Sequence, residues 1–143
     1  MFLKNKLTCK DLLLREEPLP AISIEGWIKT KRSSKNIVFI ELNDGSCQSN
    51  LQIVIDDETK LSEPLETLST GASISVNGNL VESEGANQKW EVLAKSISML
   101  GCCDNDYPLQ KKRHSDEFLR GIAHLRGRTN KYAALARIRS QLS

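Results

Sequence analysis

Apolar and polar residues alternate between positions 21 and 100, and short groups of turn-forming residues interrupt the alternation. Successive side chains of a strand point to opposite sides, so a period of two predicts half-buried β-strands. Five strands are predicted in this region, over residues 22–29, 37–42, 51–55, 74–81 and 90–99. We therefore expect residues 21–100 to form a small antiparallel sandwich or barrel.

A short helix is expected between the third and fourth strands. Pro64 stands near the start of the segment 63–68, where a helix tolerates proline, and Leu65 and Leu68 have helical spacing. Gly78, inside the fourth strand, indicates a bulge or a tight corner. Five strands with a helix between the third and fourth are the layout of the OB-fold, a small barrel that binds oligonucleotides on one face. The predicted fold class is therefore mainly β, a five-stranded OB-fold barrel followed by a helical C-terminal segment.

The pattern changes beyond residue 100. Ser115 followed by two acidic residues is typical of a helix start, and apolar residues follow it at helical spacing, at positions 118, 122 and 125. A second helix is expected near Thr129, with an apolar stripe made of Leu135, Ile138 and Leu142. The expected organisation is an OB-fold domain over residues 1–100, a hinge over 101–114, and a helical segment over 115–143 that begins a further domain.

Charge supports this division of the chain. The 143 residues carry a net charge of +2, but residues 108–143 hold nine basic and two acidic residues, which leaves −5 for the rest. A mean hydropathy of −0.36 and 27% charged residues exclude a fibrous or disordered chain. No apolar run reaches about 18 residues, and no secretory signal opens the chain. No membrane partner and a cytoplasmic location are therefore expected.

The sequence offers no pattern typical of an active site. The four cysteines form no CxxC pair, and neither histidine has zinc-ligand spacing from them. The adjacent Cys102 and Cys103 are interpreted as inert thiols. A glycine-rich phosphate loop and a His–Glu zinc pattern are also absent from the sequence. We therefore predict no metal site, no cofactor and no catalytic residue for this chain.

The second and third strands place polar and aromatic groups on one face. Val38, Ile40 and Leu42 share a phase that must face the barrel interior, so Phe39 is predicted to lie exposed beside a glutamate. The same alternation in the third strand makes Gln52 point outward. These two side chains are therefore predicted to share the outer surface of one strand pair.

Four cations lead into the same strand pair, in a polar connection over residues 31–36 and just before it: Lys29, Lys31, Arg32 and Lys35. An aromatic ring stacks an unpaired base at about 1–3 kcal/mol, an amide reads a base edge, and cations meet phosphates. Each feature also has an ordinary structural explanation, since a loop can cover the ring, water can solvate the glutamine, and the cations can form a solvated loop. Their convergence on one face favours a platform for single-stranded nucleic acid, with the three lysines as phosphate contacts.

Several segments of the chain resemble a known family. GWIKTKR (residues 26–32), FIELNDGSC (39–47) and NLQ (50–52), followed by YPLQKKRHS (107–115), IAHLR (122–126) and RTN (128–130), are similar to the anticodon-binding domain, hinge and catalytic-domain start of asparaginyl-tRNA synthetases of bacterial type. The first three segments would also fit the aspartyl and lysyl enzymes, and the last three separate them. The chain departs from the family at Gly121, where a glutamate is usual, and glycine weakens a helix by about 1 kcal/mol.

The resemblance implies specific roles. In that family the middle anticodon base, a uridine, is stacked on an aromatic ring and read by a glutamine and an arginine, which would be Phe39, Gln52 and Arg32 here. Glu91 matches a family acid near the anticodon. The full enzyme attaches asparagine to tRNA with ATP and Mg²⁺ and is a homodimer. The segments that bind ATP and form the dimer are expected to lie beyond this chain, which alone should be monomeric and unable to catalyse.

The leading hypothesis is therefore anticodon recognition on asparagine tRNA, as the N-terminal part of a ligase. Two alternatives remain: a free-standing OB module that binds single-stranded nucleic acid without an attached ligase, and a structural or regulatory protein that uses the barrel to bind another protein.

Overall fold

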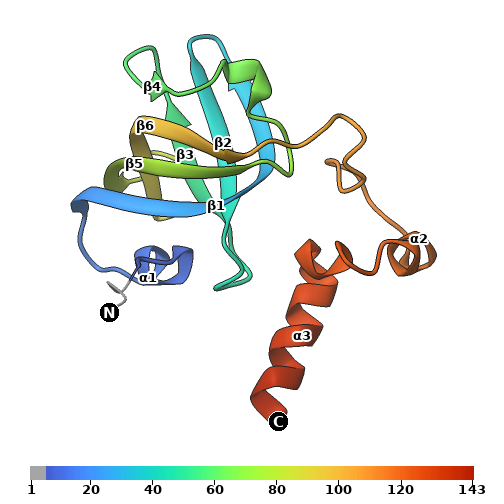
Figure 1. Ribbon diagram of the computed structural model, residues 1–143. Coiled ribbons are helices and arrows are strands. Elements are labelled where there is room, and N and C mark those ends of the chain that lie inside the picture. Colours follow the sequence, from blue (N-terminus) through green and yellow to red (C-terminus); the bar gives the residue numbers. More distant parts are fainter. Residues whose placement is uncertain (1–5) are drawn as a thin grey trace, which may run out of the picture. The chain divides into compact units, whose positions relative to one another are not determined.

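The computed structural model describes residues 6–143, which form two compact units that divide between Tyr107 and Pro108. The first unit is a β-barrel, drawn in blue to yellow in Figure 1, and the second is helical. No helix within the described residues is long and apolar enough to cross a bilayer.

The barrel contains five long strands and one short one. They are β1 (Leu19–Ser34), β2 (Ile37–Asn43), β3 (Leu51–Ile55), β4 (Lys60–Leu61), β5 (Ser73–Glu82) and β6 (Trp90–Gly101). They follow the order β3-β2-β1-β5-β6-β4, and β3 also pairs in parallel with β6, which closes the sheet. The five predicted strands correspond to β1, β2, β3, β5 and β6, so the OB-fold prediction is confirmed.

The barrel interior is aliphatic, as the alternation predicts. Ile40 and Leu42 of β2 and Leu51 and Ile53 of β3 are completely buried. The register shift next to Gly78 is a bulge, but its extra residue, Lys95, belongs to the partner strand β6 and not to β5. Burial of the aliphatic side chains drives closure at about 25 cal/mol per Å² of apolar area removed from water.

A short helix not predicted from the sequence packs into the same core. α1 (Cys9–Leu13) buries Cys9 and Leu12 in the hydrophobic cluster of the barrel. Thr8 accepts a hydrogen bond from the backbone N–H of Asp11, and the Asp11 carboxylate accepts one from the backbone N–H of Thr8. This capping box fixes where the helix begins, and its Thr-x-x-Asp pattern was present in the sequence.

The first strand is longer than expected, and the polar connection assigned to residues 31–36 is wrong. β1 pairs with β2 as far as Ser34 opposite Ile37, so the hairpin loop contains only Lys35 and Asn36. The backbone N–H and C=O groups of this polar segment form hydrogen bonds with β2. The polar side chains of the segment do not indicate this pairing. A bulge between Ile28 and Thr30 reverses the inward and outward positions from there on.

The helix expected over residues 63–68 is a single 3-10 turn, η1 (Leu65–Thr67). Pro64 before it is extended, with ψ at 144°, and Leu68 after it leaves the helical region with ψ at 71°. The position between the third and fourth predicted strands is correct, but both flanking residues have non-helical backbone angles and so limit the helix to one turn.

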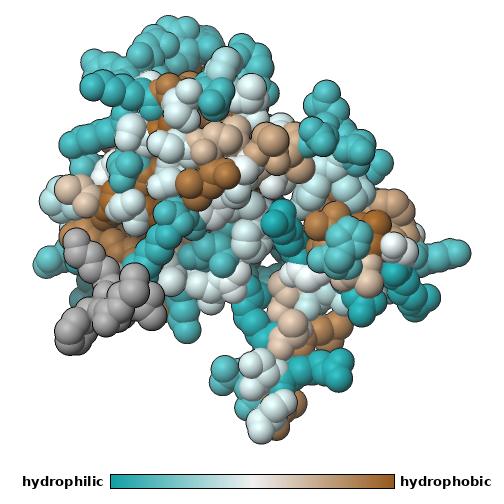
Figure 2. Space-filling view, in the orientation of Figure 1, coloured by the Kyte–Doolittle hydropathy of each residue, from teal (hydrophilic) through white to brown (hydrophobic). Residues whose placement is uncertain are grey.

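The second unit contains α2 (Asp116–Gly121), η2 (Arg126–Arg128) and α3 (Asn130–Leu142). The Ser115 hydroxyl accepts a hydrogen bond from the N–H of Phe118, so α2 begins where predicted, but the helix ends at Gly121 and does not continue to position 125. α3 begins after Thr129 as predicted. Figure 2 shows hydrophobic atoms at the surface of this unit, where exposed apolar residues include Leu135, Ile138 and Leu142.

Candidate nucleic-acid interface

Cross-strand register builds two neighbouring rows of side chains on the outside of the barrel. The Phe39 row runs across β1, β2, β3 and β6 and consists of Arg32, Phe39, Val54 and Leu93. The Gln52 row crosses the same strands and consists of Thr30, Glu41, Gln52 and Glu91. Residues that pair directly across strands share a face, and the residues between these rows, such as Ile40 and Ile53, are buried inside. Both rows therefore face away from the core.

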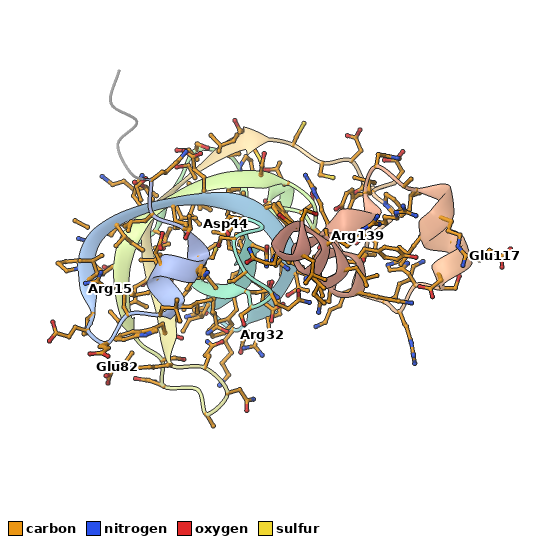
Figure 3. The ribbon with its side chains drawn as sticks, turned by 90° about the horizontal axis from the view of Figure 1, so that it is seen from below. Arg15, Arg32, Asp44, Glu82, Glu117 and Arg139 are labelled. Atoms are coloured by element: carbon orange, nitrogen blue, oxygen red, sulfur yellow. The ribbon has the colours of Figure 1, made fainter. Side chains whose placement is uncertain are left out.

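Phe39 points outward, as predicted, but it is half-buried rather than exposed. The Arg32 guanidinium carbon lies 4.7 Å from the centroid of the Phe39 ring, an arrangement typical of a cation–π contact. Arg32 itself is exposed, and Figure 3 labels it at the outside of the barrel. Leu93, at the other end of the row, is 41% exposed. Val54, between Phe39 and Leu93, is only 9% exposed. The row therefore offers an apolar surface at Phe39 and Leu93, with a cation over the aromatic ring.

Hydrogen bonds join the members of the Gln52 row in two pairs. The Gln52 side-chain amide donates to Glu91 Oε2 at 3.0 Å, and the Ser83 hydroxyl donates to the same oxygen at 2.9 Å. The Thr30 hydroxyl donates to Glu41 at 2.9 Å. Gln52 and Glu91 are half-buried, and they meet because β3 pairs in parallel with β6. Both side chains thus lie on the same face as Phe39, one row away.

The cations do not all reach this face. Lys31 pairs with the buried Ile40, and its ammonium donates to the Leu65 carbonyl at 2.8 Å. Partial burial lowers the pKa of the Lys31 amine. The expectation that Lys31 shares the surface of Phe39 is therefore wrong, because the bulge turns it to the other side. Lys29 is half-buried and lies between the two bulge positions, whereas Lys35 is exposed at the hairpin tip with a φ of +47°.

The described residues contain no group of three or more His, Cys, Asp or Glu that could hold a metal ion. Cys9 is fully buried, and this burial, together with the neighbouring Asp44 carboxylate, raises the pKa of its thiol. A buried thiol with a raised pKa is a poor nucleophile. The groups on the outer face that the structure does show are the aromatic ring of Phe39 and the hydrogen-bonded amide of Gln52.

Comparisons with known proteins identify the family and the relatives of this chain. An OB-fold nucleic acid binding domain family matches residues 22–100. The asparagine–tRNA ligase of Nitratidesulfovibrio vulgaris is 51% identical over 92% of this chain, and that of Bacteroides fragilis is 53% identical over 93%. The chain spans 29% and 28% of the length of these two relatives.

A crystal structure of asparaginyl-tRNA synthetase from Pyrococcus horikoshii has the same fold. It superposes with a TM-score of 0.77 at 22% identity and covers 96% of this chain, which corresponds to 33% of that enzyme. A second structure of that enzyme is a complex with asparaginyl-adenylate. The family match covers more than half of the chain, so this chain belongs to the OB-fold nucleic acid binding domain family, and it matches the N-terminal region of asparagine–tRNA ligases.

Proposed function

We propose that this chain recognises the anticodon of asparagine tRNA as part of an asparagine–tRNA ligase. The observation that carries the proposal is the pair of adjacent rows on the outer face, one with an aromatic ring and the other with a hydrogen-bonded amide. Single-stranded RNA is read by this combination of stacking and edge recognition. The relatives that match most of the chain are asparagine–tRNA ligases, which supports this RNA as the ligand.

The roles follow from the chemistry of the ligand. Asparagine codons have adenine in the middle, so the anticodon of their tRNA has uridine there. We assign Phe39 to stack this uridine and Gln52 to bond its edge, with Arg32 as a second reader and Glu91 beside the anticodon. Arg32 covers a face of the Phe39 ring in the free chain. A base that stacks on that face would displace the guanidinium, which could then reach the base edge or a phosphate.

The same proposal extends to the larger protein. Residues 1–100 would bind the anticodon, 101–114 would form a hinge, and 115–143 would begin the catalytic domain. The complete ligase would attach asparagine to tRNA with ATP and Mg²⁺, as a homodimer in the cytoplasm. We assign ATP and Mg²⁺ to other parts of that enzyme, as the resemblance to the family implies.

Binding to RNA stem–loops tests the proposal. A loop with the anticodon GUU should bind this chain about tenfold or more tightly than a loop with GCU, since a good bidentate contact discriminates by about 1–3 kcal/mol. Fluorescence anisotropy at one fixed salt concentration measures both Kd values. Equal affinities would instead favour a free-standing OB module for single-stranded nucleic acid, and no RNA binding at all would favour a structural or regulatory protein.

The salt dependence of RNA binding shows whether Lys35 or Lys31 contacts phosphate. Lys35→Ala is expected to reduce the slope of log K against log salt by about 0.7–1, because one phosphate contact is lost. Lys31→Ala is the matched control and should leave the slope unchanged, since the Lys31 ammonium is bonded to the Leu65 carbonyl. Kd values for the GUU loop at several salt concentrations give both slopes. A reduction by Lys31→Ala alone would show that Lys31, and not Lys35, meets the RNA.

A further inference from the structure

A chain of hydrogen bonds links the β5–β6 hairpin loop to Gln52. The Ser83 hydroxyl oxygen accepts from the backbone N–H of Gly85 at 3.1 Å and from the side-chain amide of Gln88 at 3.3 Å. The same hydroxyl donates to Glu91 Oε2 at 2.9 Å, and Gln52 Nε2 donates to that oxygen at 3.0 Å. The Glu91 carboxylate of β6 is therefore bonded by one strand residue, Gln52, and by one loop residue, Ser83, which two further loop groups hold in turn.

The donor and the acceptor of each of these hydrogen bonds can be assigned. A hydroxyl has one hydrogen and two lone pairs, and the two donors from the loop use the lone pairs of Ser83. The hydroxyl hydrogen is thereby directed to Glu91. An ionised carboxylate only accepts hydrogen bonds, so Gln52 must present its NH₂ group to Glu91 and not its carbonyl oxygen. A reversed amide would place Oε1 against the carboxylate, which is repulsive.

The orientation of this amide decides which pyrimidine it can read. The NH₂ group of Gln52 has a second hydrogen, which can donate to the O4 acceptor of uridine while Oε1 accepts from N3–H. Cytidine presents a donor at position 4 and an acceptor at N3, the opposite order. The same side chain would pair with cytidine only after the amide had rotated by half a turn. An amide free to rotate would therefore select poorly between the two bases.

We propose that Ser83 and Glu91 are positioning residues that lock the Gln52 amide in the orientation that selects uridine over cytidine. This inference rests on the proposed function, in which Gln52 reads the middle base. The neighbour of Gln52 on the other side, Glu41, is bonded to Thr30 and Asn50. Glu91 is therefore the carboxylate that orients the amide, and Ser83 holds Glu91 in place from the hairpin loop.

The test is the ratio of Kd values for the GCU and GUU loops, measured with the full chain and three variants. The wild-type ratio should be about ten or more. Ser83→Ala should lower it by about threefold or more, and Ser83→Thr, which keeps a hydroxyl, should restore it. Glu91→Gln should bring the ratio close to one, because an amide at position 91 can also donate to a reversed Gln52. If Ser83 and Glu91 had only a structural role, the variants would bind both RNA loops more weakly by the same factor, and the ratio of Kd values would not change.

The outcomes separate the two proposals. A wild-type ratio of one would overturn the proposed function, and the positioning role with it. A high wild-type ratio that persists in both Ser83→Ala and Glu91→Gln would overturn the positioning role alone. Circular dichroism of each variant confirms that it is folded. Should Ser83→Ala fail to fold, the isosteric Glu91→Gln decides the question, since a ratio that it leaves intact would contradict the inference.

Discussion

Replacing Phe39 by alanine is expected to weaken binding of the GUU stem–loop by about tenfold to a hundredfold, because base–aromatic stacking contributes about 1–3 kcal/mol. The ring lies on the outer face, one row from Gln52, and is covered by a guanidinium rather than by the core. The loss should be larger for the GUU loop than for the GCU loop, since without a stacking surface the uridine is no longer held against the amide. Fluorescence anisotropy at fixed salt gives both affinities.

Two variants separate stacking from a general loss of apolar surface. Phe39→Tyr keeps an aromatic ring and should retain most of the affinity. Ile37→Ala removes an aliphatic side chain from the same strand, at a position that is 39% exposed, and should change the Kd by less than about threefold. Equal binding by Phe39→Ala and the unmodified chain would contradict the assignment of the base platform to this ring.

The two faces of β2 and β3 could be predicted from sequence because aliphatic residues occupy every second position there. Ile40, Leu42, Leu51 and Ile53 are buried without exception, so the outward direction of Gln52 and its neighbours follows from the period alone. The half-burial of Phe39 could not be predicted in this way. The Arg32 guanidinium lies over the ring, and alternation does not describe where such a long side chain lies.

Two other features depend on details that local sequence does not carry. The bulge beside Lys29 inserts a residue without changing the composition of the strand, so the sequence does not show that Lys31 lies on the opposite side of the strand from Phe39. The bond between Gln52 and Glu91 exists only because the barrel closes through parallel pairing of β3 with β6, between residues 39 positions apart. The Thr8–Asp11 capping box, in contrast, is a local signal, and it could have identified α1.

Gly78→Ala is expected to destabilise the barrel by about 3 kcal/mol, the upper end of the usual cost of overpacking. A Cβ atom at this position would lie 2.2 Å from the Leu93 carbonyl oxygen and 3.0 Å from the Ala94 Cα. Both are backbone atoms of β6, the strand that pairs with β5 here, so no side-chain rotation can relieve the clash. Urea unfolding followed by circular dichroism measures the change in the free energy of unfolding.

Gly85→Ala in the adjoining hairpin loop is the matched control. Its Cβ would lie 3.4 Å from the nearest atom, the Ser83 hydroxyl oxygen, so its cost should stay below about 1 kcal/mol. Gly78→Ala could also lower the free energy of unfolding by no more than the control does. That result would show that β5 and β6 can move apart locally without a cost in stability. Such a shift would carry Leu93 with it, and Leu93 ends the Phe39 row. RNA affinity of the folded variant would then fall even though no residue of either row had been replaced.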